Sequence, residues 1–520
     1  YKAMLGHEMR YQNGFDCQGL WVEVEVEREL GFKSKRDIEK YGIDRFVEKC
    51  KERARKFSQI QTQQSVRLGY WMDWANSYYT MSEENNYTIW HFLQRCHQKG
   101  WIYKGHDVMP WCPRCGTAIS EHEIATEGYQ ELTHTGVFLK FPLTERPNEH
   151  LLVWTTTPWT LTSNVAAAVH PEFTYVKAKQ GEQYYYLAKE RLEVLEGKYE
   201  IREEISGQRL VGLVYRGPFD ELEAQLGVKH RVIPWKQVSP HEGTGIVHIA
   251  PGCGKEDFTL GKEFDLAVIA PLDESGNYLQ GFNWLSGRNV FEVTPAILED
   301  LKKKRLVYKA ERYTHRYPVC WRCKEELVWR TVKEWYISMD KVDSESQDKK
   351  TLRQKMISVA EKIRWIPGFG LKRELDWLKN MDDWLISKKR YWGLALPIWQ
   401  CQCGHFQVIG AKEELKQKAI EGWDKFNGHT PHKPWIDEVK IKCDQCGKKM
   451  SRVPDVGNPW LDAGIVNFSS LIDPKTGKIS YLTDKEYFKK WFPADFITEC
   501  FPGQFRNWFY SLIAMSTALE

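Results

Sequence analysis

Apolar residues recur at two different periods along this chain. Within residues 37–57 and 84–99 they fall three or four positions apart, which predicts two amphipathic helices. Residues 22–27 alternate valine with glutamate, a pattern that taken alone indicates a strand. The glutamate-rich content and the stop at Gly31 favour a helix instead, and we predict a helix there.

From residue 130 to 310 the apolar runs are short and are separated by turn signals, as in β-rich domains. Gln180-Gly181 and the run Ser275-Gly276-Asn277 are such turns. We predict strands at 137–141, 151–156, 174–179, 184–188 and 245–251. The chain as a whole therefore combines helical stretches with a β-rich insert.

Composition limits the class of protein. A chain of 520 residues is too long for one hydrophobic core and indicates about three or four domains. Hydrophobic content of 42% and charged content of 28% are typical of a globular protein, and no apolar run approaches the roughly 18 residues of a membrane span. The net charge is only +4, so any contact with nucleic acid must come from local patches.

The cysteines fall in two groups whose spacing is typical of metal sites. Cys112 and Cys115 form one C-x-x-C pair, and a matching pair, Cys320 and Cys323, follows some two hundred residues later. Four thiolates suit tetrahedral zinc, so we predict a zinc ribbon whose two halves flank an inserted domain. Buried, reduced thiols are the alternative.

A second group combines a cramped C-x-C pair with a C-x-x-C pair, and we expect a second structural zinc ion there. Its ligands are predicted to be Cys401, Cys403, Cys443 and Cys446, with His405 as a substitute ligand.

Two polar stretches predict a binding pocket. The threonine-rich run 154–164 directly follows the apolar run 151–153. The glycine-punctuated run 243–252 carries His248, and Asp257 follows nine residues later. Together they predict a pocket that hydrogen-bonds a small cationic group without covalent chemistry. The alternative for either stretch alone is a threonine-rich strand or a tight turn.

Several stretches then carry a family likeness, in the family's order. Gly14-Phe15-Asp16-Cys17-Gln18-Gly19-Leu20 is similar to the motif Gly-Trp-Asp-Cys-His-Gly-Leu. The others are 154–164, 243–257, 383–393, 460–464 and 504–509. By these motifs the chain resembles the class I aminoacyl-tRNA synthetases, most closely the isoleucyl-tRNA synthetases, over nearly all its length.

The chain departs from this family's pattern at a few positions. Gln18 replaces a usual histidine, Trp21 a proline, and Cys253 a histidine that is frequent there. The run from Glu499 to Gln504 is one residue longer than the family's and lacks its aspartate. The His-Ile-Gly-His and Lys-Met-Ser-Lys-Ser motifs are absent, and we expect a fragment in which they would lie before Tyr1 and after Glu520.

The resemblance implies an α/β fold: a split Rossmann-like catalytic domain with an inserted β-rich editing domain and zinc ribbons. The catalytic domain is expected at residues 1–105, 331–398 and 453–520, and the editing domain at 130–310. The first zinc ribbon is expected at 106–129 and 311–330, and the second at 399–452.

The resemblance also implies a function: an isoleucine–tRNA ligase that uses ATP with Mg²⁺ to join isoleucine to its tRNA and hydrolyses misattached valine. A cytoplasmic monomer without membrane contact is expected. Asp16, Glu499, Gln504 and Trp508 would bind the amino acid and its adenylate. Editing would use Thr155, Thr156, Thr157, Asn164, His248 and Asp257.

Within the editing pocket the threonines would bind the terminal adenosine and orient water, and Asp257 would hold the ammonium of valine. His248 would exclude isoleucine, and no protein group is assigned as general base. Arg390 and Trp392 are candidate tRNA contacts, with a packed Trp392 and a surface Arg390 as the alternative. A valyl or leucyl enzyme, or a deacylase and tRNA-binding module limited to editing, are the alternative functions.

Overall fold

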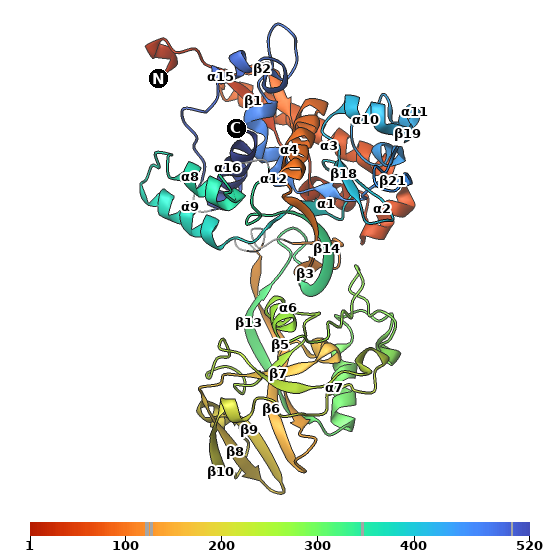
Figure 1. Cartoon of the computed structure of the whole chain (residues 1–520), viewed down its shortest axis with the longest axis vertical. Helices are drawn as coiled ribbons and strands as arrows, with labels where there is room; N and C mark the ends of the chain where they lie inside the picture. The colour runs from red at the N-terminus through yellow and green to blue at the C-terminus, as the bar shows by residue number, and fades with distance from the viewer. Residues whose placement is uncertain (120–123, 125–127, 345–347, 501–502) are drawn as a thin grey trace. The chain divides into compact units, whose positions relative to one another are not determined.

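Two separate stretches of the chain fold together on either side of an inserted segment. The computed structural model describes residues 1–119, 124, 128–344, 348–500 and 503–520. These divide into unit 1, Tyr1–Gly105 with Glu334–Glu520, and unit 2, His106–Lys333. The chain passes between them through β3 (Ile102–Cys112) and β14 (Val328–Ile337) (Figure 1). No helix in the described part of the chain is long and apolar enough to cross a membrane.

The first part of unit 1 confirms the predicted helix at residues 22–27. That helix is α1 (Leu20–Glu29), and the predicted helix at 84–99 is α4 (Glu83–Gln98). The single helix expected within 37–57 is wrong. Gly42 has φ of 110°, which breaks the helix into α2 (Lys35–Tyr41) and α3 (Ile43–Arg67).

The strand β1 (Gln12–Phe15) pairs in parallel with β2 (Asp73–Tyr79), and the loop that follows β1 carries Asp16. The second part of unit 1 adds a five-stranded antiparallel sheet in the order β18-β17-β21-β20-β19. Its strands are β17 (Ile398–Gln400), β18 (Phe406–Val408), β19 (Ala419–Glu421), β20 (Lys440–Lys442) and β21 (Lys449–Arg452). Two short strands, β16 (Ser387–Lys388) and β22 (Val456–Gly457), pair antiparallel.

Helices complete unit 1 and pack around a core rich in tryptophan. Trp90, Trp101 and Trp399 are fully buried in this core. The helices are α8 (Leu352–Ala360), α9 (Phe369–Asn380), α10 (Lys412–Lys418), α11 (Trp423–Phe426), α12 (Pro459–Gly464), α13 (Val466–Ser469), α14 (Ser480–Thr483), α15 (Lys485–Lys489) and α16 (Trp508–Leu519).

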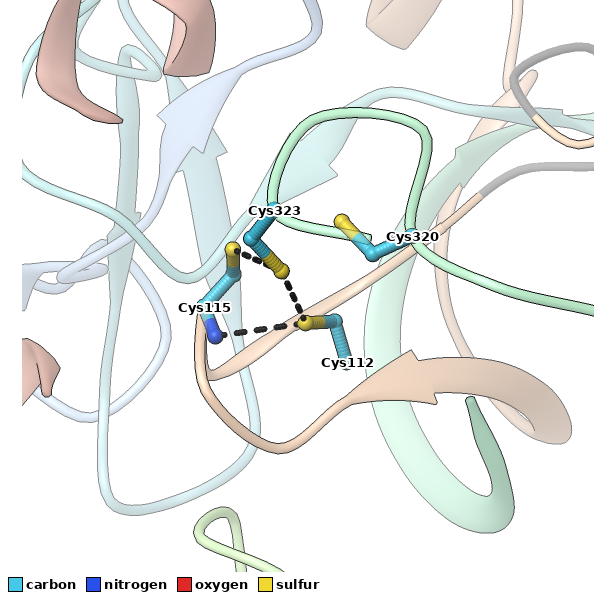
Figure 2. A group of neighbouring side chains, drawn as sticks. All are labelled: Cys112, Cys115, Cys320 and Cys323. Atoms are coloured by element: carbon cyan, nitrogen blue, oxygen red, sulfur yellow. Dashed lines mark hydrogen bonds between the residues drawn. The ribbon is translucent and has the colours of Figure 1, made fainter. Parts of the chain in front are cut away.

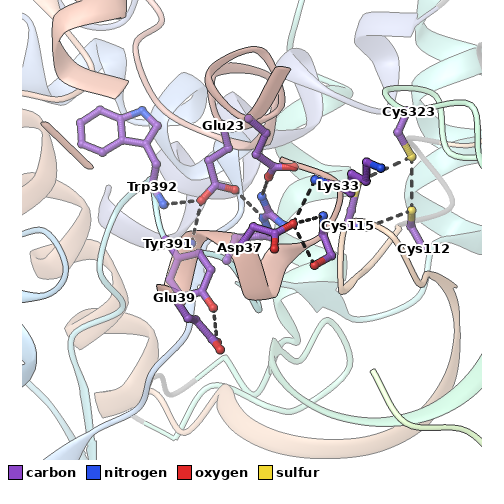
Figure 3. A network of polar contacts seen from close by, with 12 residues as sticks. Glu23, Lys33, Asp37, Glu39, Cys112, Cys115, Cys323, Tyr391 and Trp392 are labelled. Carbon is purple, nitrogen blue, oxygen red and sulfur yellow. Dashed lines mark hydrogen bonds and ion pairs between the residues drawn. The ribbon is translucent and has the colours of Figure 1, made fainter. Parts of the chain in front are cut away.

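Arg390 and Trp392 lie in the interior of unit 1, so their prediction as tRNA contacts is wrong. They are 2% and 0% exposed. The Arg390 guanidinium pairs with the carboxylates of Glu23 and Glu27 on α1, and Glu23 also accepts the backbone N–H groups of Tyr391 and Trp392 (Figure 3). A buried cation needs such partners, because an unpaired charge in the interior is costly. The alternative of a packed side chain therefore holds for Trp392, whereas the alternative of a surface side chain is wrong for Arg390, which is buried and ion-paired.

Unit 2 is built on one large, curved, mixed sheet that confirms the expected β-rich insert (Figure 1). The strand order is β10-β8-β9-β6-β12-β7-β11, with β5 paired to β6 and to β13. The strands are β5 (Tyr129–Pro142), β6 (Glu149–Thr155), β7 (Ala166–Val169), β8 (Thr174–Gln180), β9 (Gln183–Ala188), β10 (Glu200–Ser206), β11 (Arg231–Pro234), β12 (Val247–Ile249) and β13 (Val307–Pro318). A short strand β4 (Thr117–Ala118) pairs with the end of β3, and two helices, α6 (Lys255–Glu263) and α7 (Thr294–Lys303), complete the unit.

The mixed α/β architecture is as predicted, although β12 is shorter than the expected strand at 245–251. Gly245 has φ of 72°, which L-residues rarely adopt, so the extended run cannot begin there. His248 is the central residue of the shortened strand, and the chain turns after Ile249 toward α6.

Candidate amino-acid sites and metal centres

The polar stretches of unit 2 meet because two of its strands run in parallel. Val247 of β12 pairs with Trp154 of β6, so both strands end at the same edge of the sheet. Thr155 is the last residue of β6, and the 3₁₀ helix η2 (Pro158–Ser163) follows it. The sheet topology thus brings the threonine-rich run beside His248, which the sequence left ninety residues apart.

The hydroxyls of this edge are ordered by one another and by the backbone. The Thr155 hydroxyl accepts the backbone N–H of Thr157 at 3.1 Å and lies 3.3 Å from the Thr157 hydroxyl. Thr156 and Thr157 are half-buried, whereas Thr155 is buried. Their hydroxyls therefore lie at the rim of the sheet edge, where they are able to meet a ligand or water.

His248 is neutral and its tautomer follows from its partner. Burial lowers the pKa of His248 to about 4. The Thr160 hydroxyl donates its single hydrogen to the Thr157 carbonyl at 2.8 Å and lies 3.0 Å from His248 Nε2. Because that hydrogen is already used, Nε2 must carry the proton and donate it to Thr160. The imidazole is therefore uncharged at physiological pH, and its hydrogen bond to Thr160 fixes its orientation.

Asp257 is held at the start of α6 with its carboxyl turned toward the end of β12. One oxygen accepts the backbone N–H of Ala250 at 2.7 Å. Burial raises the pKa of Asp257 to about 6, the Ala250 hydrogen bond opposing this shift. Among the described residues no cation pairs with it, so a carboxylate here is desolvated and uncompensated.

Asn164 is fully buried, and its side chain supports the site from within. Its amide donates to the Ala166 carbonyl at 2.9 Å and the Ile249 carbonyl at 3.5 Å, and its oxygen accepts the Tyr215 hydroxyl at 2.8 Å. These bonds fix the end of η2 against β7 and β12. Tyr215 belongs to no motif of the sequence, because its partner lies fifty-one residues away.

In unit 1, Asp16 follows β1 at the start of the motif loop. Asp16 is exposed, yet the surrounding protein raises the pKa of its carboxyl to about 6. The backbone N–H of Gln18 and the Thr80 hydroxyl, 3.4 Å away, partly offset this shift. In the described chain no cation pairs with Asp16 either. Thr80 is a partner that sequence reasoning missed.

Of the other residues expected at the Asp16 site, two are ordered by α12 and α16. The Trp508 indole donates to the Ala463 carbonyl at 3.0 Å, and the Gln504 side chain accepts the Trp508 backbone N–H at 3.1 Å. Glu499 is exposed, and the only contact of its carboxylate within the described chain is the backbone N–H of Cys500. Residues 501 and 502 of the lengthened run lie outside the described residues.

The first cysteine group comes together as four side chains that could hold a metal ion (Figure 2). Cys112 is the last residue of β3 and Cys115 lies in the turn to β4, while Cys320 and Cys323 lie in the turn after β13. Cys323 Sγ is 3.4 Å from Cys112 Sγ and 3.7 Å from Cys115 Sγ. A tetrahedral zinc ion with Zn–S bonds of about 2.3 Å requires sulfur separations of about 3.8 Å, so the group fits.

The second group also fits, and its C-x-C half supplies both thiols. The sulfurs of Cys401 and Cys446 are 3.4 Å apart, and those of Cys403 and Cys443 are 3.8 Å apart. Gly404, with φ of 91°, lets the chain turn sharply enough for the cramped pair. The grouped ligands are the four cysteines, so His405 is not needed as a substitute.

Comparisons with known proteins agree with these motifs. The family model for class I tRNA synthetases (I, L, M and V) matches residues 1–520. The chain is 39% identical to the isoleucine–tRNA ligase of Clostridium acetobutylicum over all of the chain and 48% of that protein. It is 39% identical to the isoleucine–tRNA ligase of Methanothermobacter thermautotrophicus over 98% of the chain and 47% of that protein.

Among solved structures, GlLeuRS-CP1 is 14% identical, with a TM-score of 0.29, over 35% of this chain and 99% of that one. The chain spans about half the length of the curated relatives it matches. The match of the family model to the whole chain means that it belongs to the class I tRNA synthetases of the isoleucine, leucine, methionine and valine group.

Proposed function

We propose that this chain carries the amino-acid site and the hydrolytic editing site of an isoleucine–tRNA ligase. The observation that carries this proposal is a pair of carboxylates, Asp16 in unit 1 and Asp257 in unit 2. The surrounding protein raises the pKa of each to about 6, although Asp16 is exposed and Asp257 half-buried, and neither is ion-paired among the described residues. A bound ammonium would offset the solvation free energy that each carboxylate loses in the protein, because it supplies an opposite charge and hydrogen-bond donors. An α-amino acid supplies that ammonium at both sites.

In the synthetic site the amino acid's ammonium meets Asp16 while Trp508 and Gln504 line the side-chain pocket. The complete enzyme uses ATP with Mg²⁺ and isoleucine-accepting tRNA, and the two cysteine groups hold structural zinc. An apolar pocket rejects a substrate one methylene smaller by only ~1–3 kcal/mol, a limit for which isoleucyl-tRNA synthetase facing valine is the standard example. A second site is therefore required.

In the editing site the hydroxyls of Thr155, Thr156 and Thr157 bind the terminal adenosine and a water molecule. Asp257 holds the ammonium of the misattached valine, and the neutral His248 imidazole closes the space that isoleucine's extra methylene would need. No protein general base acts. The water is positioned by the threonines and by a ribose hydroxyl of the substrate.

ATP–pyrophosphate exchange by the full-length protein, with isoleucine, valine, leucine and methionine in turn, tests this function. We expect the highest kcat/KM for isoleucine and a value for valine about 10–200-fold lower. Preference for valine or leucine would assign the chain to another enzyme of the class. Absence of exchange with every amino acid, with deacylation retained, would leave an editing module alone.

Replacing His248 by alanine is expected to admit isoleucine to the editing site. The imidazole is 8% exposed and fixed by Thr160, so its removal leaves more space than one further methylene needs. Hydrolysis of isoleucyl-tRNA should rise at least about tenfold, while hydrolysis of valyl-tRNA changes less than about threefold. Both are measured as release of labelled amino acid. If isoleucyl-tRNA stays intact, His248 does not exclude isoleucine.

A further inference from the structure

A buried histidine far along the chain contacts the motif loop of the Asp16 site. His432 lies between β19 and β20 and is 0% exposed. Its Nε2 lies 2.9 Å from the Gln18 side-chain oxygen, and its Nδ1 lies 2.8 Å from the Thr430 hydroxyl. The ring stacks on Trp392 at 4.8 Å between centroids, and the Trp392 indole donates to the Cys17 carbonyl at 2.8 Å. Two contacts therefore join His432 to the loop that carries Asp16.

The donor and the acceptor in each hydrogen bond of the Gln18 side chain are determined by its partners. The Gln18 amide nitrogen donates one hydrogen to the Thr80 carbonyl at 2.6 Å and the other to the Asp462 carboxylate at 2.9 Å. Its oxygen is left as an acceptor only, so His432 Nε2 must donate. Burial lowers the pKa of His432 to about 3, so the ring is neutral and Nδ1 accepts from Thr430.

The far end of this chain of hydrogen bonds reaches the other wall of the same site. Asp462 is buried on α12, and its neighbour Ala463 accepts the Trp508 indole at 3.0 Å. Burial, with repulsion from Asp16 as a second cause, raises the pKa of Asp462 well above its usual range. The two N–H groups from Gln18 and Asn85 that converge on one Asp462 oxygen stabilise this carboxyl.

We propose that His432 is a positioning residue for the amino-acid site: by donating to Gln18 it fixes the side-chain amide so that both amide hydrogens point to Thr80 and Asp462. Without that donor the buried Gln18 oxygen loses its hydrogen bond, and the side chain is held through its amide nitrogen alone. The Asp16 loop and α12 would then separate by small amounts. This inference rests on the proposed function of the Asp16 site.

The test compares His432→Gln, His432→Asn and His432→Leu in the full-length protein by ATP–pyrophosphate exchange. The glutamine amide nitrogen is able to reach the position of Nε2, whereas the shorter asparagine and the apolar leucine cannot donate there. We expect asparagine and leucine to raise the KM for isoleucine about tenfold, with kcat and the KM for ATP within about twofold. Glutamine should restore the KM to within about threefold.

Equal losses in the glutamine and asparagine variants, or parallel losses in kcat and both KM values, would overturn the positioning role. Histidine-selective ¹⁵N NMR separates this outcome from failure of the proposed function. It should show Nε2 of His432 protonated and Nδ1 unprotonated down to pH 5, whether or not the protein activates isoleucine. A proton on Nδ1 would overturn the inference by itself.

Discussion

Replacing Asp257 by alanine should lower the rate of valyl-tRNA hydrolysis about 100-fold. The side chain offers an uncompensated carboxylate whose pKa burial raises to about 6, held in place by the Ala250 backbone N–H. A charge-assisted hydrogen bond from an ammonium to a carboxylate is worth about 1.5–3 kcal/mol, or roughly 10- to 150-fold, a range that includes the expected loss. The rate is measured as release of labelled valine from mischarged tRNA.

Glu256→Ala is the matched control, because Glu256 is the exposed neighbour on the same turn of α6 and should leave the rate unchanged. The pH dependence gives a second check. Because the raised pKa means that Asp257 loses its charge as pH falls through about 6, kcat/KM for hydrolysis should fall there in the native protein. Asp257→Asn should remove that fall. An unchanged rate in Asp257→Ala would exclude Asp257 from the site.

Replacing Cys320 by serine should release one metal ion and strongly destabilise unit 2. The four sulfurs of its group join the turn after β13 to the turn between β3 and β4, segments more than two hundred residues apart. Structural zinc contributes about 10–16 kcal/mol of apparent binding free energy in small metal-dependent domains. We expect about one equivalent less zinc and a lower melting temperature, measured by metal analysis and calorimetry.

Cys500→Ser is the control for this experiment, because Cys500 is exposed and belongs to neither cysteine group. A chelator should strip the second group before the first, since Cys403 and Cys446 are exposed whereas three ligands of the first group are buried. Unchanged metal content and melting temperature in Cys320→Ser would contradict a metal at this site.

The sequence predicted what depends on local pattern. The spacing of the cysteines, the strands of the insert and the helix α1 are all in place, because each follows from residues close together in the chain. The motif loop was found with its acid, Asp16. The residues expected at the editing site lie in two separate runs, and nothing in either run specifies the parallel pairing of β6 and β12 that joins these runs.

What could not be predicted depends on long-range contacts and burial. The sequence pattern around Arg390 and Trp392 does not show whether these side chains face solvent or the interior. In the fold Arg390 pairs with two buried glutamates. His432, Tyr215 and Thr80 belong to no motif, and only the fold shows which atoms they reach. The break between α2 and α3 follows from the positive φ of Gly42, and the presence of a glycine alone does not predict that angle.

The central claim is that unit 2 hydrolyses the product that the amino-acid pocket of unit 1 fails to exclude. The most direct measurement is the ratio of hydrolysis rates for valyl- and isoleucyl-tRNA, both made on isoleucine-accepting tRNA, with the native protein. We expect valyl-tRNA to be hydrolysed at least about 100-fold faster, a preference that only exclusion of the larger isoleucine can give, because the smaller valine makes one methylene contact fewer. Equal rates, or no hydrolysis of valyl-tRNA, would contradict it.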